Sequence, residues 1–207
     1  MTSVIIDHLR RALHENNAAL AFIYCAYNDR KKTEDLIRSL LKQIASQIPS
    51  LPDEVKSLYD LYQSQSKPTP RTDNVTQTLR SIAPRFARVY VVIDALDECP
   101  DDDRTDLLDA LNKVKSSMNI LVTSRPVASI KQSLHPDLEQ CIEAANEDII
   151  AYIEAQINKK RLKLSDELLE KPELRSQIVS ELVASAKGMW VFLKREKIQT
   201  HITNILN

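Results

Sequence analysis

The residues of this chain that are best suited to chemistry are three carboxylates that follow a short apolar run. Residues 89–93 are apolar and mostly β-branched, so they predict a buried strand. The strand delivers Asp94, the small Ala95 and then the acidic pair Asp97 and Glu98. In nucleoside-triphosphatases such a strand end holds Mg²⁺ and orients water against the γ-phosphate. The pattern therefore predicts Asp94 as a Mg²⁺ ligand acting through water, and Asp97 or Glu98 as the catalytic or phosphate-sensing carboxylate. The plainer alternative is an acidic, solvated helix start.

A second polar group follows another apolar run. Residues 119–123 predict a buried strand, and Ser124 and Arg125 come directly after it. A guanidinium suits phosphate because its planar fork donates two parallel hydrogen bonds, so this pair is predicted to bind a nucleotide cofactor. A surface salt bridge is an equally acceptable role for Arg125. In an open parallel sheet both strands would end on the same side, so the carboxylates and the Ser124-Arg125 pair are expected to lie together beyond the carboxyl ends of the strands.

The other half of a nucleotide site is a glycine-rich loop that ends in Lys-Ser/Thr. The chain has one glycine, Gly188, and so does not contain that loop. The sequence thus predicts a nucleotide-switch fold that lacks its phosphate-binding loop.

Apolar strands alternate with amphipathic helices along the chain. This order predicts an α/β fold in which a parallel sheet is covered by helices on both faces. Strands are expected at 19–27, 87–94 and 119–123, with a weaker one near 138–142, and helices at 3–15, 33–48, 55–62, 74–83, from about 101 to 114, from 146 and from 172 to Gly188.

Composition narrows the class of protein. A net charge of −1 gives no electrostatic reason to expect nucleic acid or an anionic membrane as a partner. No apolar stretch approaches the roughly 20 residues of a spanning helix, and the first residues do not resemble a secretory signal. The three cysteines are widely spaced, as in reduced proteins, so we expect a cytoplasmic location.

Taken together, these segments resemble the NACHT family of signal-transducing STAND P-loop NTPases. The narrower resemblance is to the nephrocystin-3-like N-terminal type, found in large fungal proteins with ankyrin or other repeats. Its most specific match is residues 91–99, Val-Val-Ile-Asp-Ala-Leu-Asp-Glu-Cys, a variation on the Walker B strand. Further matches lie at 4–9, 22–25, 36–47, 119–126, 148–153 and 186–189.

The resemblance implies that Asp94 serves Mg²⁺, that Asp97 or Glu98 serves catalysis or sensing, and that Ser124-Arg125 is the sensor after the next strand. Members bind Mg-ATP, oligomerise when activated and pass a signal from C-terminal repeats to an N-terminal effector.

Two departures from the family pattern shape the expected domains. The helix at 3–15 would follow directly on the Walker A loop, so the chain is expected to start just after that strand and loop. The last residues also diverge from the family. The expected organisation is therefore an incomplete nucleotide-binding core at 1–145, a helical extension at 146–193 and a divergent tail at 194–207.

These observations predict a fragment of a NACHT-type NTPase that does not bind or hydrolyse ATP by itself. The alternative is a non-catalytic interaction or decoy module that associates with itself or with full-length NACHT relatives. A third hypothesis is a metal-dependent hydrolase that uses Asp94, Asp97 and Glu98 without any phosphate loop.

Overall fold

The structure is a computed structural model that describes residues 2–13, 17–27, 32–64, 69–143, 145–158 and 171–186. The chain divides into two compact units, Met1–Asp137 and Leu138–Asn207. The division at residue 145 that the motifs suggest stays a prediction. Residues 187–193 and the predicted tail at 194–207 lie outside the described part of the chain.

The first unit is built on a parallel sheet with the strand order β1-β2-β3. The register pairs Tyr24 of β1 with Asp94 of β2, and Ile93 of β2 with Val122 of β3. The predicted α/β class with a parallel sheet is therefore confirmed. In chain order the elements are α1 (Thr2–Leu13), β1 (Ala18–Tyr24), α2 (Thr33–Ala45), α3 (Asp53–Ser64), α4 (Thr72–Ile82), the 3₁₀ turn Ala83–Arg85, β2 (Arg88–Asp94), the 3₁₀ turn Leu96–Glu98, α5 (Asp101–Val114), the 3₁₀ turn Lys115–Ser117, β3 (Asn119–Val122) and α6 (Ala128–Leu134).

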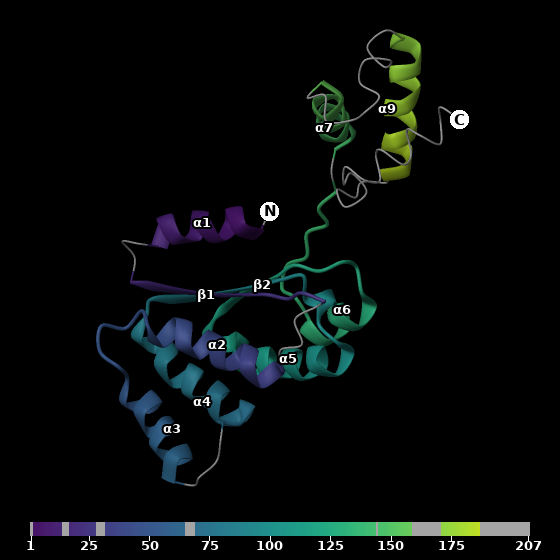
Figure 1. The fold of residues 1–207 in the computed structure, drawn as a ribbon. Coiled ribbons are helices and arrows are strands. Elements are labelled where there is room, and N and C mark those ends of the chain that lie inside the picture. Colours follow the sequence, from purple (N-terminus) through teal and green to yellow (C-terminus); the bar gives the residue numbers. More distant parts are fainter. Residues whose placement is uncertain are drawn as a thin grey trace. The chain divides into compact units, whose positions relative to one another are not determined.

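Helices cover both faces of this sheet, as the sequence predicts (Figure 1). Successive strand residues point to opposite faces, so the two faces of one strand enter different cores. The main core joins the sheet to α2, α4 and α5, and it includes Ile23 and Ile93. On the other face Leu20 and Val92 pack with Ile6 of α1. A strand buried on both faces explains the nearly continuous apolar run that ends at Asp94.

The outer edge of β1 is closed by two glutamines, Gln43 of α2 and Gln47 in the turn that follows α2. The Gln43 side chain accepts a hydrogen bond from Phe22 N at 3.0 Å and donates one to Phe22 O at 2.9 Å. Gln47 does the same for Leu20, at 3.0 and 2.8 Å. Residues four apart on a helix are separated by about 6.0 Å, which nearly matches the ~6.6 Å between alternate strand residues. The two amides therefore satisfy backbone groups of Leu20 and Phe22 that a neighbouring strand would otherwise pair with.

The second unit contains α7 (Asn146–Asn158) and α9 (Pro172–Ala186), which contact each other. Buried apolar residues lie on both helices, among them Ile153 and Ile178. The strand predicted near 138–142 is wrong, since residues 138–143 form neither strand nor helix. Leu138 is 86% exposed and Ile142 is 63% exposed. An extended segment becomes a strand only when a neighbour pairs with its backbone, which apolar residues alone do not supply.

Replacing Gln43 with leucine is expected to destabilise the first unit by about 1–2 kcal/mol, because Phe22 loses two hydrogen bonds. The uncovered edge of β1 is also expected to increase aggregation. Urea unfolding and light scattering measure the two effects. Gln77→Leu is the matched control, because Gln77 is exposed on α4, and its effect is expected within about 0.5 kcal/mol. Equal stability of the two variants would contradict the proposed closure.

Candidate functional site

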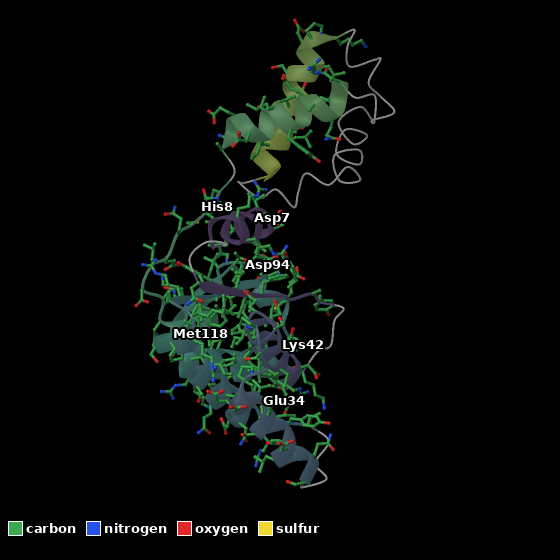
Figure 2. The ribbon with its side chains drawn as sticks, turned by 90° about the vertical axis from the view of Figure 1, so that its left-hand side faces the viewer. Asp7, His8, Glu34, Lys42, Asp94 and Met118 are labelled. Atoms are coloured by element: carbon green, nitrogen blue, oxygen red, sulfur yellow. The ribbon has the colours of Figure 1, made fainter. Side chains whose placement is uncertain are left out.

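Asp94, the predicted Mg²⁺ ligand, lies at the carboxyl end of β2, beneath α1 (Figure 2). Its Oδ1 atom accepts hydrogen bonds from two hydroxyls, Thr2 Oγ1 at 2.5 Å and Thr123 Oγ1 at 2.6 Å. Thr2 is the first residue of α1 and is 5% exposed. The structure thus places a hydroxyl of a helix start against the strand-end carboxylate. Sequence reasoning missed both threonines as partners of this carboxylate.

Thr123 connects the ends of β2 and β3. Its backbone N–H donates to Ile93 O at 2.9 Å, which continues the pairing of the strands by one residue. Its hydroxyl accepts a hydrogen bond from Ala95 N at 3.0 Å while donating to Asp94. Its carbonyl accepts one from Leu96 N at 3.0 Å. Four contacts therefore hold the segment after β2 in a single position.

The backbone conformation at position 95 explains why a small residue follows Asp94. Ala95 has φ 54° and ψ 49°, in the left-handed region, which costs a non-glycine residue about 1–2 kcal/mol. A β-branched side chain would fit this position worse than alanine. The left-handed residue turns the chain sharply into the 3₁₀ turn Leu96–Glu98, in which Leu96 is fully buried. Asp97 and Glu98 leave this turn toward different partners.

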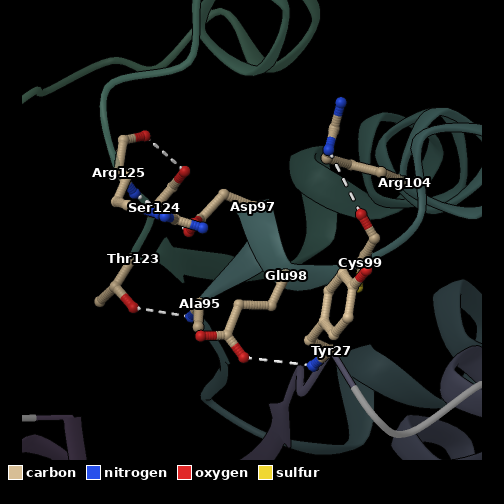
Figure 3. Close-up of polar contacts among 9 residues, drawn as sticks. All are labelled: Tyr27, Ala95, Asp97, Glu98, Cys99, Arg104, Thr123, Ser124 and Arg125. Atoms are coloured by element: carbon tan, nitrogen blue, oxygen red, sulfur yellow. Dashed lines mark hydrogen bonds and ion pairs between the residues drawn. The ribbon is translucent and has the colours of Figure 1, made fainter.

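Asp97 forms an ion pair with Arg125 (Figure 3). The Arg125 side chain donates through Nε to Asp97 Oδ2, and the Arg125 backbone N–H donates to Oδ1 at 3.0 Å. The Asp97 side chain is 6% exposed, whereas that of Arg125 is 72% exposed. Burial opposes ionisation of Asp97, but the hydrogen bonds and charge of Arg125 outweigh it and lower the Asp97 pKa below its usual value.

Glu98 and Ser124 make separate contacts. Glu98 Oε2 accepts a hydrogen bond from Tyr27 N at 3.2 Å, which joins the segment after β1 to this edge. The Ser124 hydroxyl donates to Arg125 O at 2.6 Å. All five predicted residues therefore lie at the carboxyl edge of the sheet, and Asp97 and Arg125 touch directly. Their roles in binding a metal or a nucleotide remain predictions.

The arrangement offers Mg²⁺ one suitable position. Magnesium favours one or two carboxylates plus waters, and Asp94, whose carboxylate is oriented by the Thr2 hydroxyl, would meet that requirement through water. The Asp97 and Glu98 carboxylates are directed to Arg125 and Tyr27 instead. Among the described residues, no three histidine, cysteine or acidic side chains form a group able to hold a metal ion. This divergence weighs against a hydrolase that uses the three carboxylates jointly.

Two buried thiols lie beside this edge. Cys25 follows β1, Cys99 follows the 3₁₀ turn, and their sulfurs are 2.9 Å apart. The hydrogen bond between the thiols, together with burial and the nearby Asp94 and Asp97 carboxylates, raises the pKa of Cys25. The same hydrogen bond lowers the pKa of Cys99, assisted by the charge of Arg104. Spacing in the sequence gives no signal of this contact.

Comparison with known proteins identifies the family. Residues 1–125, more than half of the chain, match the family described as "Nephrocystin 3, N-terminal". The chain belongs to this family. The predicted nephrocystin-3-like N-terminal type is thereby confirmed, and the match includes β1, β2, β3 and all five predicted site residues.

Other comparisons add little. One matching solved structure is titled "Structure of C. elegans PCH-2", with 13% sequence identity, 99% of this chain and 68% of that chain covered, and a TM-score of 0.32. No curated protein matches the chain. Within the described ranges, no helix has both the length and the apolar character needed to cross a membrane.

Replacing Arg125 with alanine is expected to lower the free energy of unfolding at pH 7 by only a small amount, because one partner of the ion pair is exposed. The lowered pKa of Asp97 means that the ionised carboxylate stabilises the fold above the unfolded pKa, about 3.9. That contribution is lost as the pH falls through the folded pKa. The difference between wild type and variant is thus expected to shrink at acidic pH.

Urea unfolding at several pH values measures this difference. Lys56→Ala is the control, because Lys56 and Asp53 form an exposed pair within one helix, and its effect is expected to be smaller. A difference for Arg125→Ala that stays constant down to pH 3 would rule out the ion pair as its source.

Proposed function

We propose that the first unit is the nucleotide-binding core of a NACHT-type STAND P-loop NTPase. The observation that supports this most directly is Asp94, at the carboxyl edge of a parallel sheet and in contact with a hydroxyl from the first turn of a helix. In P-loop NTPases a strand-end Asp helps to hold Mg²⁺ beside the start of the helix that follows the phosphate-binding loop.

The residues at this edge then take defined roles. Asp94 serves Mg²⁺ through water, and the Thr2 hydroxyl orients its carboxylate. When bound, the ion neutralises charge that develops on the phosphates. Asp97 or Glu98 orients the attacking water or senses the γ-phosphate. Ser124 and Arg125 contact phosphate oxygens, which requires the Arg125 guanidinium to leave Asp97. Such an exchange would free the Asp97 carboxylate when a nucleotide binds.

These 207 residues are nevertheless proposed to bind ATP poorly on their own. Their one glycine excludes a Gly-x-x-x-x-Gly-Lys-Ser/Thr loop, the part that supplies backbone N–H groups and a lysine to the β- and γ-phosphates. Each charge-assisted hydrogen bond contributes about 1.5–3 kcal/mol. Three missing bonds would weaken binding by about 10³-fold or more.

Titration with a fluorescent ATP analogue, with and without Mg²⁺, tests this proposal. We expect a Kd above about 1 mM for residues 1–207, since about three such bonds are missing.

A second experiment joins a Walker A strand and loop from the family ahead of α1. This addition is expected to restore Mg²⁺-dependent binding, and Asp94→Asn in the extended chain is expected to remove the Mg²⁺ dependence. Asp102→Asn is the matched control, because Asp102 is exposed on α5. Tight binding by the unmodified chain would contradict the inactivity. An extended chain whose binding still depends on Mg²⁺ after the Asp94→Asn substitution would contradict the role of Asp94.

The second candidate function is an interaction or decoy module that co-assembles with full-length NACHT relatives. One observation favours it, namely that β3 is a four-residue edge strand whose Leu121 is 39% exposed. An edge strand can pair with a strand from another chain. Co-purification with a full-length relative, reduced by Leu121→Arg but not by Leu61→Arg on α3, would favour this function. Equal recovery with both variants would oppose pairing through β3.

The remaining predictions belong to the same proposal. They include a cytoplasmic location, partners that are proteins and not nucleic acid or membrane, and descent from large repeat-containing signalling proteins of fungi. Family membership supports descent from the nephrocystin-3 type.

A further inference from the structure

The contact between Cys25 and Cys99 is unusual in its geometry. The residues are 74 positions apart in sequence, yet their sulfurs are separated by 2.9 Å. That distance exceeds the length of an S–S bond by only about 0.9 Å. Cys25 N also donates a hydrogen bond to Asp94 O at 2.9 Å. The backbone of Cys25 is therefore held against the end of β2, the strand that precedes Cys99.

We propose that Cys25 and Cys99 are an oxidation site at which a small peroxide produces an intramolecular disulfide. One thiolate attacks a peroxide oxygen, the O–O bond breaks, and the sulfur becomes a sulfenic acid while hydroxide or alkoxide leaves and takes up the proton that the thiol released on ionising. The second thiol then attacks the sulfenic sulfur, the S–S bond forms, and water departs with the remaining proton. Overall, two thiols are oxidised by two electrons and the peroxide is reduced.

The burial of the two thiols favours a small oxidant and an intramolecular disulfide as the product. Each of the two residues is 9% exposed, which admits a small molecule but not the cysteine of a second protein. The neighbouring Ala26 and Tyr27 are exposed, so solvent reaches this segment. The third cysteine, Cys141, is exposed. The geometry therefore favours an internal bridge over a link between chains. Disulfides of this transient type are the ones usually found in reducing compartments.

The bridge would act on the candidate site. Cys99 directly follows Glu98, and Cys25 lies two residues before Tyr27, whose N–H donates to Glu98. A covalent bond between these segments would fix the turn that carries Asp97 and Glu98 to the segment after β1. This inference depends on the thiols alone and holds whether or not the chain binds a nucleotide.

Hydrogen peroxide and peptide mapping test the proposal on the full chain. Trypsin, which cleaves after lysine and arginine, places the three cysteines on separate peptides, residues 12–30, 89–104 and 132–159. After oxidation and alkylation of the remaining thiols, we expect peptides 12–30 and 89–104 to be linked. Two of the three thiols should be lost, and dithiothreitol should restore them.

The variants make the result specific. Cys141→Ser is expected to form the same link, whereas Cys25→Ala and Cys99→Ala are each expected to abolish it. The wild-type map decides the question even if a buried variant fails to fold. Linkage of either peptide to 132–159, covalent dimers, or peptides 12–30 and 89–104 that remain alkylated under conditions that oxidise Cys141 would overturn the proposal.

Discussion

The fold and its candidate site both depend on the hydroxyl of Thr123, which lies between the last residue of β2 and the residue that follows it. It donates to the Asp94 carboxylate and accepts from the Ala95 N–H, so one side chain satisfies the polar groups on both sides of the bend. Without it, the left-handed Ala95 would carry a conformational cost with little compensation. The positions of Leu96 and the two acidic residues after it follow from that bend.

The same bend separates the acidic side chains. Because Asp97 reaches Arg125 and Glu98 reaches the backbone of Tyr27, three neighbouring carboxylates do not face one another, and their mutual repulsion is reduced. Each carboxylate joins a different segment to the carboxyl end of β2. Asp94 contacts α1, Asp97 contacts the segment after β3, and Glu98 contacts the segment after β1. The carboxyl ends of the strands are therefore a junction of four segments, an arrangement consistent with the proposed nucleotide site.

Much of this could be predicted from the sequence, but only where the signal is local. Residues 89–94 form a strand because their apolar run is buried on both faces, and Asp94 is at the sheet edge because it ends that run. The contact of Thr2 with Asp94 spans 92 residues and has no local signal. The thiol pair is similar in this respect. The error at residues 138–142 had the opposite cause, because a local apolar pattern existed there without a strand beside it.

The two glutamines along β1 also limit how the end of α2 and the turn after it can vary in length. Inserting or deleting one residue between Gln43 and Gln47 would rotate one amide by about 100° around the helix, away from the strand. Relatives that retain this pair are thus expected to accommodate length changes before Gln43 or after Gln47. Among homologous chains, the five-residue interval from Gln43 to Gln47 should stay free of gaps even where its apolar neighbours are exchanged.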